Sequence, residues 1–418
     1  MVGSRRGRQR GRPRVLILVQ NLPVPLDRRV WQESRALAAA GYEVHVVCPR
    51  TKAHPGRRET LNGIRIHRYS PGPEARRFAG YLLEYGIAIV AQLRLALGVR
   101  FRGHIDVVHI CNPPDLLFLV ALPLITSGSA LIYDHHDACP ELMMAKGNRE
   151  GGWQVRVNML LERLTYRFAD VSIETNESFR DIALGRGGMS QEDVFVVRSA
   201  PQVTRFAGAR PDESWRHGRK YMVGYVGIMG LQDGLDYLID AAELIVLGWQ
   251  RQDIQFVLVG AGPEFPRLRE RVRALGLADQ VVFTGMVSDN AILGEVLATA
   301  DVCVSPDAAS RMNNISTMNK IMEYMALGKP IVQFDLHEGR FSAGDASLYA
   351  VPNDVESLAK CIVQLIDDPD TRIRMGRLGF ERLRTTLSWE LQVPKLLAAY
   401  ERALVKKSGG VRGGSHAN

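Results

Sequence analysis

The pattern of apolar and polar positions divides the chain into two successive series of predicted strands and helices. The first series opens with an apolar run over residues 14–19, an amphipathic helix over residues 29–40 and a second apolar run over residues 43–48. Strand, loop, helix and strand in this order form the unit of a doubly wound parallel sheet. The same order begins again at residues 221–226, before a predicted helix over residues 235–246. The pattern predicts an α/β protein with two parallel-sheet domains, for which 418 residues suffice.

The domain boundary is predicted where polar, breaker-rich residues interrupt this pattern. Residues 205–219 are rich in glycine, proline and charge, which is typical of a linker. We therefore expect one domain over residues 14–204, a second over residues 220–385 and an amphipathic final helix over residues 386–405. The arginine-rich residues 1–13 and the glycine-rich residues 406–418 are predicted to be disordered.

Composition narrows the class of protein. With 46% hydrophobic and 23% charged residues, the chain has the composition of a globular protein. Its five cysteines are scattered and form no C-x-x-C pair, which argues against a disulfide framework or a zinc site and favours a reducing cytosol. No secretory signal is visible, and the longest apolar tracts, residues 81–97 and 116–125, are interrupted by polar residues or proline. We therefore expect a cytoplasmic protein without a membrane-spanning helix.

The net charge of +8 is concentrated partly at the start, where residues 1–14 contain six arginines and no acid. Such an arm could contact anionic lipid or nucleic acid. A solvated tail is the simpler interpretation, and we expect no nucleic-acid partner.

The most informative stretch is residues 311–340, RMNNISTMNKIMEYMALGKPIVQFDLHEGR. Asn319 and Lys320 open a predicted helix whose apolar positions recur at helical spacing, with Glu323 among them. Gly328 and the following proline end the helix before a short apolar strand. A carboxylate on a helix at the carboxyl ends of parallel strands is well placed to bind a ribose diol. The alternative is a solvated charge beside a methionine-rich core face.

EYMALGKPIV resembles the donor-binding helix of glycosyltransferase family 4, whose motif is Glu, seven residues, Glu, followed by Ala, Gly and Pro. Glu323 matches the second Glu, which holds the ribose of a sugar nucleotide in that family, and the first Glu falls on Ile315. The preceding residues resemble a bacterial branch with Ser, Thr, Met, Asn and Lys, so Ser316 and Thr317 join the expected donor site. The resemblance implies a retaining, metal-independent enzyme without a cofactor. It also implies the GT-B fold, in which two Rossmann-like domains enclose a cleft and a final helix crosses back onto the first domain.

The loop after the strand at residues 221–226 contains three glycines, which would let backbone amides approach a phosphate. We expect Gly230, Gln232 and Asp233 to lie at the donor. The family has an Arg and a Lys in this loop, whereas this chain has Ile228 and Asp233. Lys320 is therefore the predicted cation for the diphosphate.

Two further segments of the second half resemble the donor side of the family. Gly260 and Gly262 belong to a GAGPE turn like the family's Gly-x-Gly-Pro-Glu, although a plain βα turn would have the same composition. Met286 follows the strand whose end contacts the nucleobase in that family.

The loop after the first strand, NLPVPLDRR, contains no glycine, which argues against a nicotinamide cofactor at this end. Arg28 or Arg29 could contact an anion there, and a surface position is the alternative.

Ionisable residues gather where a later strand of the first half ends, with Asp134, His135, His136 and Asp137 in succession. Parallel sheets bind ligands at such ends, and two adjacent histidines face opposite ways, which argues against a shared metal. One histidine could instead be structural. The segment also resembles the family's His-Asp turn, whose histidine lies beside the transferred sugar. His136 with Asp137 is the closest match, and His135 is the alternative.

Residues 78–97 form a broadly apolar predicted helix flanked by Arg76, Arg77, Arg100 and Arg102. A membrane surface and a protein core explain this pattern equally well. Together with the resemblance, it leads us to expect transfer of a sugar from a nucleotide-sugar donor to a lipid-linked or polysaccharide acceptor, at the cytoplasmic face of a membrane. A sugar-nucleotide epimerase of the same fold and a non-catalytic sugar-nucleotide-binding protein remain alternatives.

Overall fold

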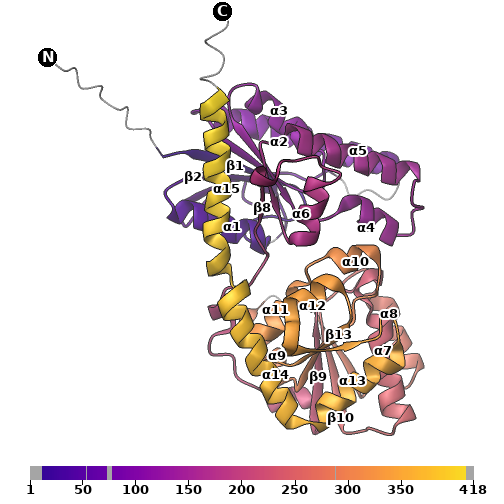
Figure 1. The fold of residues 1–418 in the computed structure, drawn as a ribbon. Helices are drawn as coiled ribbons and strands as arrows, with labels where there is room; N and C mark the ends of the chain where they lie inside the picture. The colour runs from indigo at the N-terminus through magenta and orange to yellow at the C-terminus, as the bar shows by residue number, and fades with distance from the viewer. Residues whose placement is uncertain (1–11, 53, 73–77, 288, 411–418) are drawn as a thin grey trace, which may run out of the picture. The chain divides into compact units, whose positions relative to one another are not determined.

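The computed structural model describes residues 12–52, 54–72, 78–287 and 289–410. The chain divides into two compact units, drawn in Figure 1. Unit 1 comprises Met1–Val197 and Val393–Asn418, and unit 2 comprises Arg198–Gln392. The predicted basic arm lies outside the described residues apart from positions 12 and 13.

Unit 1 is built on an eight-stranded sheet of order β3-β4-β2-β1-β5-β6-β7-β8. Only β3 pairs antiparallel, with β4; all other neighbours are parallel. The strands are β1 (Arg14–Val19), β2 (Glu43–Pro49), β3 (Arg58–Leu61), β4 (Ile64–Tyr69), β5 (Val107–Cys111), β6 (Ala130–His135), β7 (Val171–Glu174) and β8 (Val194–Val196). Since the strand order runs outward in both directions from β1 and β5, the loops after these two strands flank the topological switch point.

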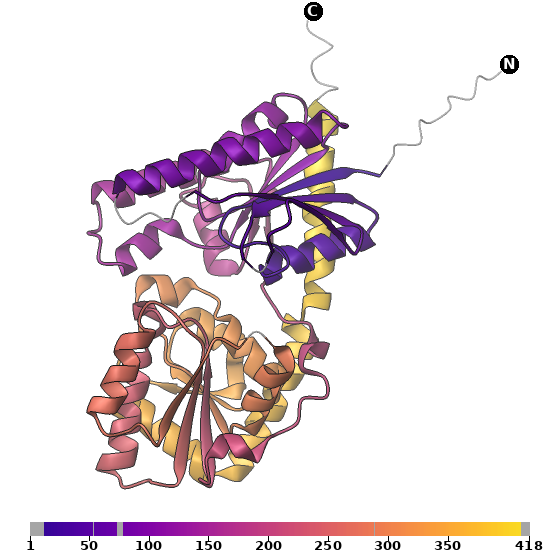
Figure 2. The same ribbon diagram turned by 180° about the vertical axis from the view of Figure 1, so that it is seen from behind.

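Helices cover both faces of this sheet. They are α1 (Arg28–Ala39), α2 (Phe78–Arg100), α3 (Phe118–Ile125), α4 (Cys139–Ala145), α5 (Trp153–Phe168), α6 (Glu177–Leu184) and α15 (Trp389–Gly410). Residues of α2 and α3 pack in one core cluster with alternate residues of β1, β5 and β6, whereas α1 and α15 contact the opposite face. Figure 1 shows the α15 side of the unit, and Figure 2 shows the α2 side.

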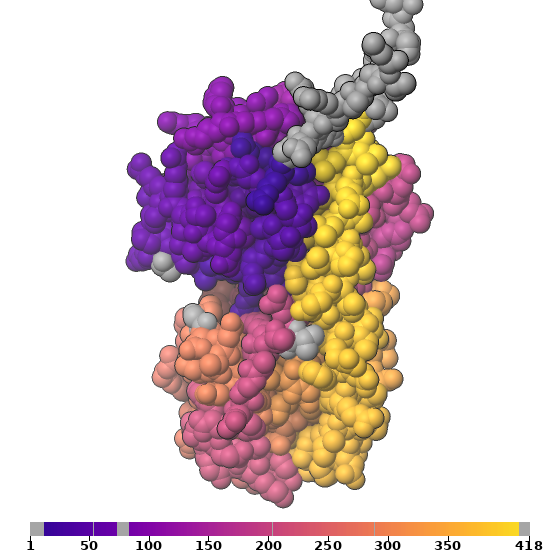
Figure 3. Space-filling view, turned by 90° about the vertical axis from the view of Figure 1, so that its left-hand side faces the viewer, coloured from indigo at the N-terminus to yellow at the C-terminus, as the bar shows by residue number. Residues whose placement is uncertain are grey.

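The final helix is longer than predicted. It continues to Gly410, so residues 406–410, expected to be disordered, are helical instead. Ion pairs explain this extension, because Lys406 Nζ lies 2.6 Å from Asp193 Oδ2 and Arg402 Nε lies 2.8 Å from Asp193 Oδ1. The outer side of α15, in yellow, is visible in the space-filling view of Figure 3.

Unit 2 is built on a six-stranded parallel sheet of order β11-β10-β9-β12-β13-β14. Its strands are β9 (Tyr221–Val226), β10 (Ile254–Val259), β11 (Val281–Gly285), β12 (Val302–Ser305), β13 (Ile331–Phe334) and β14 (Ser347–Ala350). Its helices are α7 (Leu235–Glu243), α8 (Phe265–Ala274), α9 (Asn290–Thr299), α10 (Arg311–Ile315), α11 (Asn319–Ala326), α12 (His337–Ala343), α13 (Val355–Asp367) and α14 (Pro369–Arg382). Here the switch point lies between β9 and β12, so the loops after these strands define its binding edge.

The predicted linker, residues 205–219, packs against unit 2. Phe206 is 6% exposed and belongs to the core cluster that also contains Ile321 and Met322 of α11. Arg216 forms an ion pair with Asp301. The segment has the composition of a linker because its turns need glycine and proline. Its one phenylalanine, Phe206, nevertheless packs it into the core of unit 2.

The described helices of the structure include none that is both long and apolar enough to cross a membrane. The two parallel sheets confirm the predicted fold class.

A pair of stacked histidines makes the stability of unit 1 dependent on pH. Nδ1 of His45 lies 3.0 Å from Nε2 of His67, and the rings are parallel within 2°. Burial and the neighbouring His45 lower the pKa of His67 to about 4, and burial also lowers the pKa of His45. Because the ordinary pKa of histidine is about 6.5, protonation favours the unfolded chain over this interval.

We therefore predict that His67 makes the free energy of unfolding fall as the pH drops from about 6.5 to about 4. The measurement is urea unfolding of the wild type and His67→Gln at pH 7 and pH 5. The wild type should lose more stability than the variant over this step. Equal losses would contradict a shifted His67.

Candidate active site

The candidate residues of unit 1 lie where β6 ends, next to the loop that follows β5. Asp134 and His135 are the last residues of the strand, and His136 and Asp137 form the turn after it. Asn112, directly after β5, fixes this turn, because its Oδ1 accepts hydrogen bonds from the backbone N–H of His136 at 2.6 Å and of Asp137 at 3.2 Å.

Asp134 is the centre of a buried cluster of charged groups. Nη2 and Nε of Arg29 in α1 donate to its two oxygens at 2.7 Å and 3.1 Å, and Nε2 of His136 lies 2.5 Å from Oδ2. Burial alone would raise the pKa of Asp134, but Arg29 and His136 hold it well below its ordinary value. Asp134 is therefore a permanent carboxylate that orients the His136 ring.

The neighbouring Glu33 has the opposite tendency. It is completely buried, and burial together with the negative charge of Asp134 raises its pKa well above the ordinary value. Arg29, whose Nε lies 3.2 Å from Glu33 Oε1, opposes this shift.

Arg29 does not fit the predicted role of an anion contact. It is 7% exposed, and its guanidinium also donates to the carbonyl oxygen of Val197 at 2.7 Å. Its guanidinium pairs with Asp134, so in this structure Arg29 joins α1 to the end of β6. Arg28, the other candidate, is exposed at the first position of α1.

The two histidines occupy different environments. His136 is partly exposed, with 16% of its side chain accessible, whereas His135 is completely buried. His135 faces the other side of the sheet, where Nδ1 lies 3.0 Å from Glu174 Oε2 and Nε2 lies 3.7 Å from Glu162 Oε1. Although burial lowers it, these carboxylates raise the pKa of His135 to about 9. His135, the alternative catalytic histidine of the sequence analysis, is thus a charged core residue that contacts no surface.

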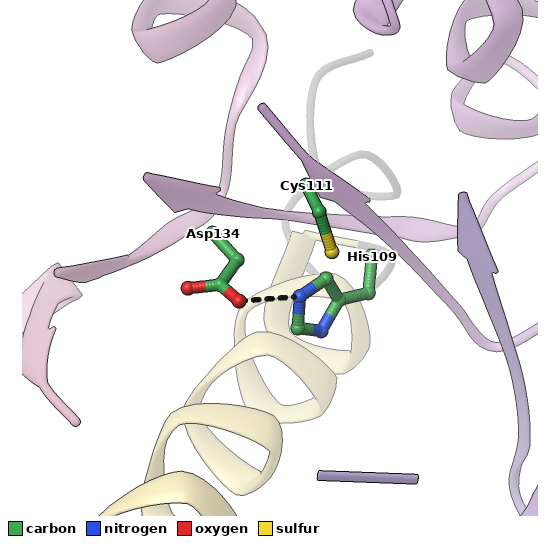
Figure 4. A group of neighbouring side chains, drawn as sticks. All are labelled: His109, Cys111 and Asp134. Atoms are coloured by element: carbon green, nitrogen blue, oxygen red, sulfur yellow. Dashed lines mark ion pairs between the residues drawn. The ribbon is translucent and has the colours of Figure 1, made fainter. Parts of the chain in front are cut away.

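Three side chains in unit 1 have the spacing of metal ligands. Atoms of His109, Cys111 and Asp134 lie within 4.8 Å of one another, as Figure 4 shows. His109 Nε2 is 3.3 Å from Asp134 Oδ2, and its Nδ1 is 2.6 Å from the hydroxyl of Tyr400 in α15. The guanidinium of Arg29 already provides the positive charge at Asp134, so this donor set does not favour a cation.

The candidate donor residues of unit 2 gather at the carboxyl edge of the second sheet. Glu323 lies in the middle of α11, with 8% of its side chain exposed, and forms an ion pair with Arg205. The helix is confirmed, and its apolar residues Ile321, Met322 and Met325 are fully buried in the core.

Lys320 lies beside the glycine loop, but its charge is not available as predicted. Its Nζ is 2.8 Å from Asp307 Oδ1, in the loop after β12, and 3.8 Å from Asp233 Oδ1. Although burial lowers it, the two carboxylates raise the pKa of Lys320, and burial raises the pKa of Asp233. The three groups carry one positive and up to two negative charges, so Lys320 does not by itself form an anion site.

The glycines of this edge mainly allow the loops to pack closely. Gly260 has φ +142°, and a Cβ there would lie 1.8 Å from the carbonyl oxygen of Gly227; one on Gly262 would lie 2.5 Å from that of Met229. The N–H of Gly230 is taken by Asp233 Oδ2 at 3.0 Å. The loop amide that was expected to meet a phosphate thus meets a carboxylate of the loop itself.

The remaining predicted donor residues lie at the same edge. Asn319 is exposed at the start of α11, Met286 is 69% exposed after β11, and Ser316, Thr317 and Gln232 are half-buried. Asn313 connects these parts, because its Nδ2 donates to the carbonyl oxygens of Gln232 and Ala308, both at 2.8 Å. Ile315, where the family has its first Glu, ends α10.

Sequence reasoning missed four residues that organise these edges: Arg205, Asp307, Asn313 and Asn112. Asp307 and Asn112 follow the strands β12 and β5, but nothing in the sequence indicates partners 13 and 24 positions away. Arg205 belongs to the segment interpreted as a linker.

Two doubly wound sheets with polar groups at both switch points define a protein with two Rossmann-like domains. Two family models match this chain, one over each half. "Glycosyl transferase 4-like domain" matches residues 26–200, and "Glycosyl transferases group 1" matches residues 220–368.

Comparison with known proteins agrees with these matches. The chain is 26% identical over 397 residues to 2-deoxystreptamine glucosyltransferase of Streptomyces kanamyceticus. The aligned region covers 91% of this chain and 99% of that protein. Sucrose-phosphate synthase from Thermosynechococcus elongatus has the same fold, with a TM-score of 0.78, 20% identity and coverage of 94% and 100%. Anabaena Alr3699/HepE, solved in complex with UDP and glucose, gives a TM-score of 0.70 at 17% identity, with coverage of 93% and 99%.

The chain therefore belongs to the group 1 glycosyltransferases, the family 4 class of retaining enzymes with the GT-B fold. It is a hexosyltransferase that uses a nucleotide-sugar donor. The family that the sequence resembles is thus confirmed. The roles of the individual site residues stay predictions.

We predict that the two adjacent histidines respond oppositely to mutation. His135→Ala should lower the free energy of unfolding by about 3 to 5 kcal/mol, because it leaves Glu174 buried without its cationic partner. His136→Ala should cost little stability and should reduce turnover. Denaturant unfolding and an activity assay of both variants test this assignment, and a stable but inactive His135→Ala enzyme would reverse it.

We also predict that Asp233→Asn raises the affinity for a nucleoside diphosphate by about fivefold or more, since a unit charge removed near the phosphates is worth roughly 1 kcal/mol. Asparagine can still accept the hydrogen bond from Gly230, so the loop should remain intact. Calorimetric titration with the diphosphate and the free nucleoside measures the effect. The nucleoside should bind unchanged, and weaker diphosphate binding would show that Asp233 assists the donor.

Proposed function

We propose that this hexosyltransferase transfers its sugar to a lipid-linked glycan acceptor at a membrane surface, with Glu323 holding the ribose of the donor and His136 facing the transferred sugar. The observation that supports the acceptor class is the outer surface of the helices that cover one face of the unit 1 sheet.

The outward stripe of α5 is apolar and basic. Trp153, Val157 and Leu160 are 55%, 43% and 56% exposed, although they are large apolar side chains in a helix. They alternate at helical spacing with three exposed arginines, Arg156, Arg163 and Arg167. The one acidic residue of α5, Glu162, is completely buried on the opposite side, so the stripe carries only positive charge.

The helix α2 has a similar surface. Leu83, Ile87 and Val90 are 58%, 37% and 59% exposed at successive turns, and the exposed Arg94 follows one turn later. Beyond the helix, Phe101 is 85% exposed. The predicted flanking residues Arg76 and Arg77 lie outside the described residues.

This combination favours a lipid surface over a protein partner. Apolar side chains among arginines match the interfacial region of an anionic membrane, where the side chains enter the boundary of the acyl chains and the guanidinium groups meet the phosphates. A protein-binding patch would instead be expected to have an apolar centre surrounded by a polar rim. An acceptor held at a membrane would be a lipid-linked saccharide.

The donor role of Glu323 is supported by its place on α11 beside the loops after β9 and β12. A carboxylate can accept hydrogen bonds from both hydroxyl groups of a ribose.

On the acceptor side, Nε2 of His136 contacts Asp134, so Nδ1 is the atom that would contact a substrate. Asp137 adjoins it, and burial raises its pKa. We assign His136 and Asp137 positioning and electrostatic roles in the retaining reaction.

A transfer assay distinguishes the acceptor classes. The protein is incubated with radiolabelled UDP-, ADP- or GDP-glucose and with either membrane lipid extract containing lipid-linked sugars or 2-deoxystreptamine, the acceptor in the name of the Streptomyces relative. We expect label in the organic-solvent-extractable fraction. Label only in water-soluble 2-deoxystreptamine products would reject the lipid-linked acceptor.

We predict that Leu160→Glu weakens binding to phosphatidylglycerol-rich vesicles by about tenfold or more, because it removes one inserted apolar side chain and adds a repelled charge. Ile373→Glu is the matched control, since Ile373 is 72% exposed in α14 of unit 2 and should not affect binding. Vesicle sedimentation measures the effect. If both variants bind like the wild type, and light scattering shows that Leu160→Glu only dissociates a dimer, the surface is a protein interface.

A further inference from the structure

Glu323 is connected to a residue that no donor motif contains. Nη1 of Arg205, in the short helix η2 (Val203–Phe206), donates to Glu323 Oε1, and Nη2 donates to Asn290 Oδ1 at 3.1 Å. Asn290 is the first residue of α9, just beyond Met286 and the end of β11. The guanidinium therefore spans from the predicted ribose carboxylate to the loop predicted to meet the nucleobase.

The turn that carries Arg205 is fixed to unit 2. The Arg205 guanidinium lies 4.7 Å from the ring centre of Phe206, which is 6% exposed and packs in the core with residues of α11. The helix α9 approaches this turn closely, because a Cβ on Gly294 would lie 2.9 Å from Cβ of Ala209 and 3.4 Å from Phe206. Arg205 thus has a defined position relative to both α9 and α11.

The hydrogen bond from Arg205 does not by itself prevent Glu323 from binding a diol. A carboxylate has about four acceptor positions on its two oxygens, and Arg205 uses Oε1. The two side chains are only 13% and 8% exposed, so the ion pair is less screened than a surface pair. Without the guanidinium, the Glu323 carboxylate would lose a hydrogen bond that holds its rotamer in this poorly solvated position, and other rotamers would become populated.

We infer that Arg205 is a positioning residue of the donor site: it holds the Glu323 carboxylate in a rotamer directed toward the ribose, and Asn290 orients Arg205. This inference rests on the proposed role of Glu323. The opposite possibility is a latch, in which Arg205 covers Glu323 and must leave before the nucleotide binds. The two differ in the sign of the effect when Arg205 is removed.

Binding to ribo- and 2′-deoxyribonucleotides provides the test. The probes are UDP, ADP and GDP with their 2′-deoxy counterparts, titrated by calorimetry into the wild type, Arg205→Met, Glu323→Gln and the double variant. Arg210→Met is the matched control, because Arg210 is an exposed arginine of the same segment. Melting temperatures check that each variant is folded.

We expect the wild type to prefer the best ribonucleotide over its 2′-deoxy form by about tenfold or more, the usual effect of a hydrogen bond to a charged group. Arg205→Met should reduce ribonucleotide affinity by about tenfold and leave 2′-deoxyribonucleotide affinity nearly unchanged. In the Glu323→Gln background, the same substitution should have no further effect. Arg210→Met should bind like the wild type.

Each other outcome has a definite meaning. Tighter binding by Arg205→Met would establish a latch and overturn the inference, as would unchanged binding. Equal losses for both nucleotide types would show a general structural role. The proposed ribose site would instead be rejected if the wild type bound ribo- and 2′-deoxyribonucleotides equally well and Glu323→Gln left both affinities unchanged. If the wild type prefers ribonucleotides, and only Glu323→Gln and not Arg205→Met loses this preference, the role of Arg205 is rejected and the ribose site is kept.

Discussion

The ion pair between Arg29 and Asp134 is the interaction on which the candidate edge of unit 1 depends. It joins α1 to the end of β6, and the carbonyl oxygen of Val197 and the His136 ring are held by the same two side chains. Burying two charges is unfavourable unless their geometry is good, and here two parallel hydrogen bonds compensate for the lost water. Burial raises the pKa of the neighbouring Glu33, and within the pair Asp134 adds to this shift whereas Arg29 opposes it. The ring of His136 is thereby oriented from inside the protein.

Unit 2 uses charge in a different way, because its predicted cation is neutralised within the fold. Lys320 contacts two carboxylates, and one of these, Asp233, stands where the family has a lysine. The glycine loop is thus closed by the protein's own carboxylate, and the amides that a phosphate would use are partly occupied.

The helices over one face of the unit 1 sheet perform two tasks. Their inner residues complete the core with β1, β5 and β6, and their outer residues present leucine, valine and tryptophan beside arginine. A core does not require large apolar side chains on its outer side, so this exposure must have another cause. The sequence pattern of residues 78–97 was compatible with a core helix or with a helix at a membrane surface. The inner face of α2 fits the first interpretation, and its outer face fits the second.

The sequence by itself determined the two parallel-sheet domains, most strand positions, the helix of Glu323 and the family, because these follow from local periodicity and from a contiguous motif. It could not decide which histidine is buried, since adjacent residues at a strand end face opposite sides and only the neighbouring helices define the interior. It predicted Arg29 as a possible anion contact and Lys320 as the cation for the diphosphate, but it could not indicate the carboxylates that pair with them from 105 and 13 positions away. Local patterns carry the preference of each segment for helix or strand, but the charge state of a side chain depends on which distant groups the tertiary structure brings within a few ångströms of it.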